Sequence, residues 1–260
     1  MHPTIHLFTL EISAYSLFYT LAAFVAAGMA FAKRKSFGIG KWDLTQLLCL
    51  TFVSAAVGAK LVSSLIQMGR TGTANLASLA TAGGEEYGAY LFGPLCVILF
   101  AKMRGIDWRN ALDLSAYVAL AYGPVASLGC LYHGCCYGIA VPWGVRSPYA
   151  SGPVLPTQAL YGLGFVILLV VFLVLRPERK HPGILYPIFL LSYCGVYSFL
   201  LEFLRGDDRG SFLMFTIAQW IAIAVVVAAS AVIIFEKRQS ACVSHTKAPG
   251  PAWRAAGCSP

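Results

Sequence analysis

Seven stretches of this chain are long and apolar enough to cross a lipid bilayer, and they constrain the fold more than any other feature. A hydrocarbon core of about 30 Å needs about 20 apolar residues in one helix. The stretches are Ser13–Ala32, Thr45–Met68, Glu85–Lys102, Leu114–His133, Thr157–Leu175, Gly183–Leu204 and Ser211–Phe235. We therefore expect an all-α polytopic membrane protein with seven transmembrane helices. The third is the shortest in strictly apolar residues, because two glycines and two glutamates flank its start.

The composition agrees with a membrane domain. The chain has 260 residues, of which 58% are hydrophobic and only 12% are charged. A soluble domain would carry about 25% charged residues, so this chain has too little polar surface for water. We expect one membrane domain over residues 1–238. Residues 239–260, where Ala, Gly, Pro and Ser surround Cys258, are expected to form a disordered cytoplasmic tail.

The positive charges are placed as topology signals. The net charge is +8, but Lys and Arg cluster at the ends of apolar stretches, so we expect no nucleic-acid partner. They are most frequent after the first, third, fifth and seventh stretches, which predicts an outside N-terminus and a cytoplasmic C-terminus. The first stretch is too long for a signal peptide and is expected to remain as an anchor. There is no internal repeat to support a transporter architecture.

Polar side chains on the first two spans are candidates for function, because such groups are costly in lipid. Tyr15 and Tyr19 are four residues apart and so share one helix face. They could contact a substrate or anchor the helix at the interface. Lys60 lies well inside the second span and must pair, face a cavity or snorkel to the surface.

The outer end of the fourth span carries the densest group of reactive side chains. The segment Gly129–Gly138 contains three glycines, three cysteines and His133, followed by Arg146 in the next loop. Its glycines indicate a sharp turn at the membrane face. The cysteines could bind metal, form a disulfide from Cys130 to Cys135 or Cys136, or simply pack. Adjacent cysteines suit one tetrahedral zinc poorly and no second ligand cluster exists on the outer side, so we expect no metal site.

A charged segment ends the sixth span. Glu202 and Arg205 are three residues apart and can pair on one helix face. Arg205 or Arg209 could instead hold a lipid phosphate, because a guanidinium offers a planar fork of donors. The remaining alternative is a loop of charges at headgroup level without a substrate.

The chain resembles the prolipoprotein diacylglyceryl transferase family over residues 2–238, because it has similar segments in the same order. The matching segments are His2-Pro3-Thr4-Ile5 with Tyr15, Gly58-Ala59-Lys60, Gly83-Gly84, Gly129–Gly138, Pro156-Thr157-Gln158, Glu202–Asp207 and Gln219-Trp220. Residues 134–138 read Gly-Cys-Cys-Tyr-Gly, as in one branch of that family.

The resemblance implies an activity and its partners. The family transfers the diacylglyceryl group of phosphatidylglycerol to the lipobox cysteine in a prolipoprotein signal peptide, in the inner membrane of a bacterial cell, without a cofactor. Carried onto this chain, it implies catalytic roles for Tyr15, His133, Glu202 and Arg205. The implied lipid- or phosphate-binding residues are Lys60, Ser127, Gly129, Cys130, Gly138, Arg146 and Arg209.

The chain departs from the family at several positions. Ser127, Ser198 and Lys60 stand where the family has arginine, Cys130 stands where it has asparagine, and a family histidine has no counterpart near Tyr87, Gly88 and Tyr90. His133 could act as a base, and Lys60, Arg146, Arg205 or Arg209 could supply positive charge. Two alternatives stay open. The first is a divergent paralogue that binds or processes another lipid. The second is a membrane thiol oxidoreductase that uses Cys130, Cys135 and Cys136.

Overall fold

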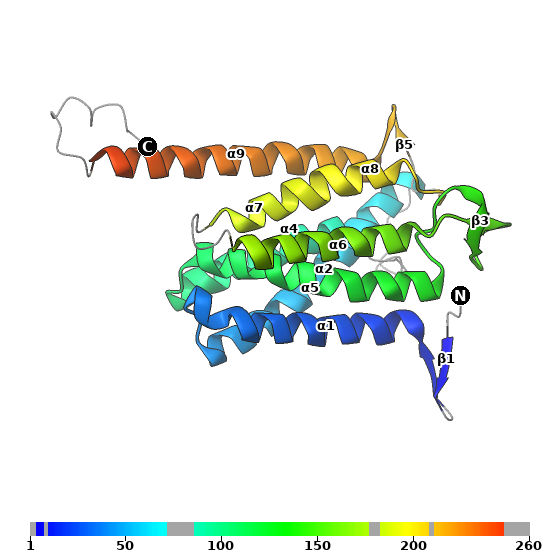
Figure 1. Cartoon of the computed structure of the whole chain (residues 1–260), viewed down its shortest axis with the longest axis horizontal. Helices are drawn as coiled ribbons and strands as arrows, with labels where there is room; N and C mark the ends of the chain where they lie inside the picture. Colours follow the sequence, from blue (N-terminus) through cyan, green and yellow to red (C-terminus); the bar gives the residue numbers. More distant parts are fainter. Residues whose placement is uncertain (1–3, 8–9, 72–85, 177–182, 208–210, 247–260) are drawn as a thin grey trace.

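The computed structural model describes residues 4–7, 10–71, 86–176, 183–207 and 211–246, and they form a bundle of long helices (Figure 1). The single long helices are α1 (Ala14–Lys33), α2 (Lys41–Thr71), α4 (Glu86–Arg104), α5 (Trp108–His133), α6 (Thr157–Leu175) and α9 (Ile217–Thr246). Between α6 and α9 the chain forms a continuous helical segment made of α7 (Leu185–Phe189), the π-helical η3 (Leu190–Tyr197) and α8 (Ser198–Glu202). A short 3-10 helix, η1 (Arg34–Phe37), follows α1.

Six of the helical segments in the described residues are long and apolar enough to cross a membrane, which confirms a mostly helical, polytopic fold. They are Ala14–Phe37, Lys41–Met68, Trp108–His133, Thr157–Leu175, Leu185–Glu202 and Ile217–Glu236. The helix α4 coincides with the third predicted span and has 19 residues, but Glu86, Lys102 and Arg104 lie at its ends. It does not belong to the six, so the seventh span remains a prediction.

Short strands accompany the helices without changing the mostly helical, polytopic fold. Three antiparallel hairpins lie outside the helices: β1 (Thr4–Leu7) with β2 (Leu10–Ser13), β3 (Ala140–Arg146) with β4 (Pro153–Val154), and β5 (Ser211–Phe212) with β6 (Phe215–Thr216). They gather at one end of the bundle, at the right in Figure 1. We call this the hairpin end.

The last predicted span also needs correction at its start. The apolar run predicts a start at Ser211, but a hairpin occupies that segment and α9 begins only at Ile217. The helix then continues to Thr246, past the predicted domain end at residue 238. The remaining part of the predicted tail lies outside the described residues.

Small residues let α1 pack closely against α5. Ala14, Ala22, Ala26 and Ala30 are fully buried, and their spacing in multiples of four places them on one helix face. On the other side of the contact, a methyl group on Gly129 would lie 2.8 Å from Cβ of Phe18. Close approach through small residues is the usual way in which membrane helices associate.

The helices α2 and α4 make a second close contact. A methyl group on Gly88 would overlap the backbone of Gly58. In α4, Pro94 has no N–H to donate to the carbonyl of Tyr90, and the Tyr186 hydroxyl donates to that carbonyl instead, at 3.0 Å. A backbone group that would be costly in lipid is thereby satisfied by another helix.

The segment from α7 to α8 is held in place by a buried carboxylate. Asp113 on α5 is fully buried and accepts hydrogen bonds from the backbone N–H groups of Gly183 (2.6 Å), Leu185 (2.9 Å) and Tyr186 (3.3 Å). These donors precede or begin α7, where a helix has no acceptors of its own. This contact therefore fixes the start of the helical segment, whose other end carries Glu202.

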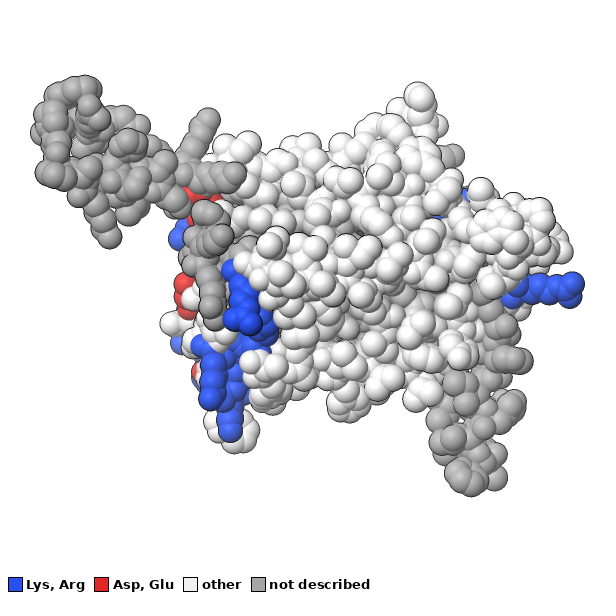
Figure 2. All heavy atoms as spheres, in the orientation of Figure 1, with Lys and Arg blue, Asp and Glu red and all other residues white. Residues whose placement is uncertain are grey.

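The two ends of the bundle differ in charge. Figure 2 shows a dense group of Lys and Arg side chains at the end opposite the hairpins, at the left in the view. Here Arg104 at the end of α4 makes an ion pair of 2.8 Å with Asp43 at the start of α2. Far fewer charges are visible at the hairpin end.

Candidate functional site

The Gly-Cys-Cys-Tyr-Gly segment, residues 134–138, forms a tight turn directly after α5, and we call it the cysteine turn. Gly134 has φ +89°, and Cys136 has φ +57°. The Thr157 hydroxyl donates to the Cys136 carbonyl at 2.6 Å, and the Gln158 amide donates to the Cys135 carbonyl. The Pro-Thr-Gln motif at the start of α6 therefore fixes the backbone of this turn.

The end of the cysteine turn joins the segment that follows α8 through backbone hydrogen bonds. The Ile139 N–H donates to the Leu204 carbonyl at 2.9 Å, and the Gly206 N–H donates to the Tyr137 carbonyl at 3.0 Å. A methyl group on Gly138 would lie 2.7 Å from the Leu204 oxygen and 2.7 Å from Cγ2 of Thr157. Only glycine fits at this crossing. The absence of a side chain at Gly138 therefore lets the cysteine turn approach the Glu202–Asp207 segment closely.

On one side of the cysteine turn lies an aromatic cluster around His133. The His133 ring stacks on Tyr149 with a centroid distance of 5.4 Å and meets the edge of Tyr15 at 5.9 Å. Its Nε2 lies 3.3 Å from the Tyr149 hydroxyl. Its Nδ1 is buried and has no hydrogen-bond partner among the described residues. Tyr15 stacks in turn on Tyr19 at 4.0 Å, so the predicted residues Tyr15 and His133 are brought together.

On the other side lies a cluster of charged groups around Arg205. The Arg205 side chain is 7% exposed, and it donates to both oxygens of Asp207 from Nε at 2.8 Å and from Nη2 at 2.5 Å. Glu202 lies 4.0 Å from the Arg205 Nε and accepts a hydrogen bond of 3.2 Å from Thr216. The predicted pair of Glu202 and Arg205 is present, but Asp207 occupies the guanidinium fork.

Arg205 stays charged in this setting. Burial lowers the pKa of Arg205. The electrostatic interactions with Cys136 and Asp207 raise it by a larger amount, so the pKa lies well above its ordinary value. The guanidinium also lies over the ring of Tyr161 on α6, with 5.9 Å to the ring centroid. A permanent cation therefore sits beside the cysteine turn.

The predicted lipid-binding glycine and serine have packing contacts. Gly129 abuts Phe18, as described above. Ser127 faces α6, where a methyl group on Gly162 would come within 3.1 Å of its Cβ. Both positions therefore lie in contacts of α5 with its neighbours.

The other predicted cations are dispersed. Lys60 is exposed on α2, and Arg146 is exposed at the last position of β3. Arg209 lies outside the described residues.

Several site residues were missed by sequence reasoning. Tyr149 contacts His133 but lies in a loop without a pattern that marks it, and Asp207 belongs to the matching segment Glu202–Asp207, where it was not assigned as the partner of Arg205. Tyr87 on α4 lies in a hydrogen bond of 3.2 Å with Ser198 on α8, and both side chains are buried. Two positions where the chain departs from the family pattern are thus in contact, and that coupling has no signal in a single sequence.

The three cysteines of the segment form a compact group. The Sγ atoms of Cys130, Cys135 and Cys136 all lie within 4.8 Å of one another, and none of the three is in a disulfide within the described part of the chain. A hydrogen bond with Cys130 lowers the pKa of Cys135, but the bond with Cys136 and burial outweigh it and raise the pKa to about 12. This thiol is therefore protonated at neutral pH and is a poor nucleophile.

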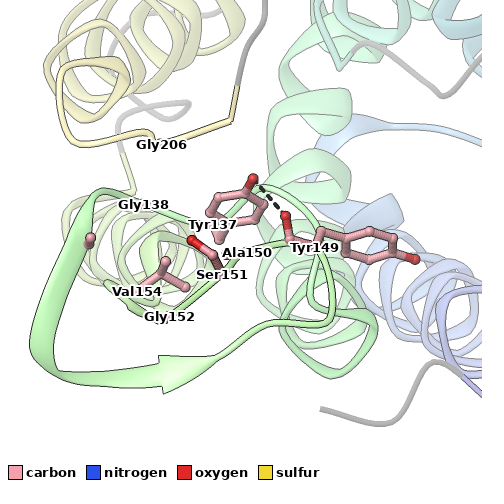
Figure 3. A pocket seen from close by; sticks show the side chains of 9 residues that line it. Tyr137, Gly138, Tyr149, Ala150, Ser151, Gly152, Val154 and Gly206 are labelled. Atoms are coloured by element: carbon pink, nitrogen blue, oxygen red, sulfur yellow. Dashed lines mark hydrogen bonds between the residues drawn. The ribbon is translucent and has the colours of Figure 1, made fainter.

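A hollow of about 330 Å³ opens beside the cysteine turn (Figure 3). It is lined by residues of the turn, the β3–β4 hairpin and the segment after α8: Tyr137, Gly138, Ala140, Tyr149, Ala150, Ser151, Gly152, Val154 and Gly206. The Tyr137 hydroxyl donates to the Tyr149 carbonyl at 3.0 Å, and the Tyr149 ring points away from the hollow.

Comparison with known proteins identifies relatives along nearly the whole chain. The family model described as prolipoprotein diacylglyceryl transferase matches residues 3–235. A phosphatidylglycerol--prolipoprotein diacylglyceryl transferase of Clostridium tetani is 29% identical over 239 residues, which are 87% of this chain and 94% of that protein. A second enzyme of this name from Clostridium perfringens is 28% identical, over 85% of this chain and 90% of its own length. One from Ralstonia pickettii is 24% identical, over 92% and 96%.

Proposed function

Since the chain belongs to the prolipoprotein diacylglyceryl transferase family, we propose that it transfers the diacylglyceryl group of phosphatidylglycerol to the lipobox cysteine of a prolipoprotein signal peptide. The names of the bacterial relatives support both the lipid donor and the protein acceptor. They also support a place in the bacterial inner membrane, as do the six membrane-length helices. The match over residues 3–235 is the observation that carries the proposal.

The proposed orientation places the hairpin end outside and the C-terminus in the cytoplasm. It rests on the positive-inside rule, because the basic side chains gather at the opposite end (Figure 2). The segment Glu86–Arg104 would be the seventh span, and residues 1–238 would form the membrane domain. Residues 239–260 would be a cytoplasmic tail, helical to Thr246. The lipid and the signal peptide would then meet beside the cysteine turn.

The reaction requires one bond to form and one to break. The acceptor sulfur forms a bond to the carbon of the diacylglyceryl group that carries the phosphate. The bond between this carbon and the phosphate oxygen breaks. The electron pair leaves on the oxygen of glycerol 1-phosphate, and the thiol proton passes to a base. We assign the base to His133, because Tyr149 and Tyr15 hold its ring while its buried Nδ1 has no partner among the described residues.

The leaving phosphate requires a cation, and we assign this role to Arg205. Its fork could bind two phosphate oxygens, as it now binds the two oxygens of Asp207. Binding of the lipid would then require Asp207 to give up the fork. Glu202 would hold the guanidinium in place from the other side, and Tyr15 would line the thiol side of the site.

The proposal is tested with purified protein in detergent, phosphatidylglycerol and a peptide that carries a lipobox cysteine. Mass spectrometry should show the mass of one diacylglyceryl group added to the peptide, and none when the peptide cysteine is serine. His133→Ala should lower the rate by about 100-fold or more. Tyr132→Ala, which changes the exposed neighbour of His133, serves as the matched control. No transfer beside an active relative would overturn the proposal.

A second candidate function is favoured by the serines that replace family arginines. Ser198 is buried against Tyr87, and Ser127 packs on α6, so neither position supplies a charge to a phosphate. A paralogue that binds or processes another lipid would show no transfer, and the lipids that co-purify would identify its ligand. A thiol oxidoreductase would instead show Cys130, Cys135 and Cys136 cycling with a quinone.

A further inference from the structure

The cysteine turn holds its three thiols on a rigid frame. Cys130 lies in the last turn of α5, whereas Cys135 and Cys136 follow the helix. The carbonyls of Cys135 and Cys136 accept hydrogen bonds from Gln158 and Thr157, whose side chains are almost fully buried. The backbone that carries the thiols is thus fixed without any ion.

The spacing of the sulfur atoms suits a single ion with three sulfur ligands. The Sγ atoms lie within 4.8 Å of one another. In a planar three-coordinate centre with metal–sulfur bonds of about 2.3 Å, the sulfurs would be about 4 Å apart. Small rotations of the cysteine side chains, which shorten these separations by less than about 1 Å, would therefore bring all three sulfurs to bonding distance of one ion. Such rotations are smaller than a change of rotamer.

The composition of the cluster selects a class of metal. Among the described residues, the group contains three sulfur atoms and neither an imidazole nor a carboxylate. Thiolates favour soft ions such as copper(I) and zinc over Mg²⁺ and Ca²⁺. Zinc is almost always four-coordinate in protein sites, and the cluster offers three ligands. A monovalent ion that accepts three ligands is the better match.

The surroundings of the cluster compensate the charge of bound thiolates. The permanently charged Arg205 interacts electrostatically with Cys136. The Tyr19 hydroxyl lies 3.6 Å from Sγ of Cys130 and can donate to it once the thiol has lost its proton. Buried negative charge would be costly without such partners.

Although the sequence leads us to expect no metal site, because adjacent cysteines suit tetrahedral zinc poorly, we propose that Cys130, Cys135 and Cys136 form a three-thiolate site for copper(I) at the hairpin end of the bundle. Binding replaces the protons of the coordinating thiols with the metal ion and releases these protons to solvent. No electron is transferred, because copper enters and remains in the monovalent state. The proposal does not depend on the transferase reaction, because its test measures metal binding alone.

The test uses the full chain with Cys49, Cys96, Cys242 and Cys258 changed to Ser, kept reduced and free of oxygen. Copper(I) is titrated in competition with a chromophoric copper(I) chelator. We expect one equivalent to bind, and an X-ray absorption spectrum with three sulfur ligands. Cys130→Ser, Cys135→Ser and Cys136→Ser, each in this background, should weaken binding at least tenfold. Cys194→Ala, a buried thiol in η3 outside the cluster, is the matched control.

Two results would overturn the proposal. One is a parent protein that cannot compete with the chelator although it is monodisperse and helical by circular dichroism. The other is copper affinity that survives substitution of each cluster cysteine in turn. Because three single variants are compared, the misfolding of one of them does not remove the test.

Discussion

At the scale of single residues, His133 has its two ring nitrogens in different surroundings. Nε2 faces the Tyr149 hydroxyl at 3.3 Å, whereas Nδ1 is buried without a partner among the described residues. The bond that one nitrogen makes decides which tautomer is present. If Tyr149 donates to Nε2, the proton lies on Nδ1; if it accepts, Nδ1 is free to take the proton of a substrate thiol.

This arrangement predicts the effect of Tyr149→Phe. The substitution keeps the ring that stacks on His133 but removes the hydroxyl that selects the tautomer. We expect kcat for peptide lipidation to fall by about tenfold, less than for His133→Ala. Tyr137→Phe, which removes the hydroxyl bound to the Tyr149 carbonyl, separates the tautomer effect from loop positioning. Equal losses in Tyr149→Phe and Tyr137→Phe would contradict the tautomer assignment.

The charges around Arg205 give a second prediction at this scale. Asp207 competes for the guanidinium fork that we assign to phosphate, so Asp207→Asn should lower KM for phosphatidylglycerol several-fold. Arg205→Lys keeps the charge but loses the fork, and it should raise the same KM by about tenfold. Both are measured as initial rates against lipid concentration. A higher KM in Asp207→Asn would show that Asp207 positions Arg205 rather than competing with the lipid.

At the scale of elements, the position of the start of α7 depends on one carboxylate. Asp113→Ala would leave three backbone N–H groups near the start of α7 without their acceptor. A buried donor without a partner costs about 1–3 kcal/mol. We therefore expect a loss of about 3 kcal/mol or more in the free energy of unfolding, measured by denaturant titration in detergent. Asp113→Asn retains one acceptor and should lose less; equal losses would contradict the capping role.

The contact between α2 and α4 predicts a difference between two glycines. Gly88→Ala should separate the helices, because the added methyl group overlaps the Gly58 backbone, and the melting temperature in detergent should fall. Gly28→Ala on α1 is the matched control, because a methyl group there meets no atom within 4 Å. Alanine favours helix over glycine by about 1 kcal/mol, so the control should be neutral or stabilising. A similar fall in both variants would exclude the steric explanation.

The sequence predicted the helices better than the contacts between distant segments. Apolar runs placed α6 at its observed bounds and α1 within one residue, because lipid exposure sets the length of a span. The hairpin at Ser211–Thr216 was missed, since Phe212, Leu213 and Phe215 prolong the apolar run into a turn. Glu202 and Arg205 were found through their helical spacing. Tyr149 was not, because only tertiary structure brings it to His133, and the role of Asp207 as partner of Arg205 two residues away was not assigned.

At the scale of the whole molecule, the polar chemistry and the basic charges lie at opposite ends of the bundle. The hairpins, the cysteine turn and Arg205 share one end, and the dense group of Lys and Arg marks the other (Figure 2). This separation matches an enzyme that receives a secreted signal peptide on one face while its positive loops stay in the cytoplasm. It also makes the proposed orientation testable at two single positions.

The last prediction concerns that orientation. Met214, between β5 and β6, is 88% exposed, and Met103, near the end of α4, is 85% exposed. Met214→Cys and Met103→Cys, each made in the chain with all eight cysteines changed to Ser, are treated in spheroplasts with a maleimide that cannot cross membranes. We expect Met214→Cys to be labelled at once and Met103→Cys only after the membrane is permeabilised. The reverse order would place the cysteine turn in the cytoplasm, where a secreted signal peptide could not reach it from outside, and both the orientation and the assigned site would have to be abandoned.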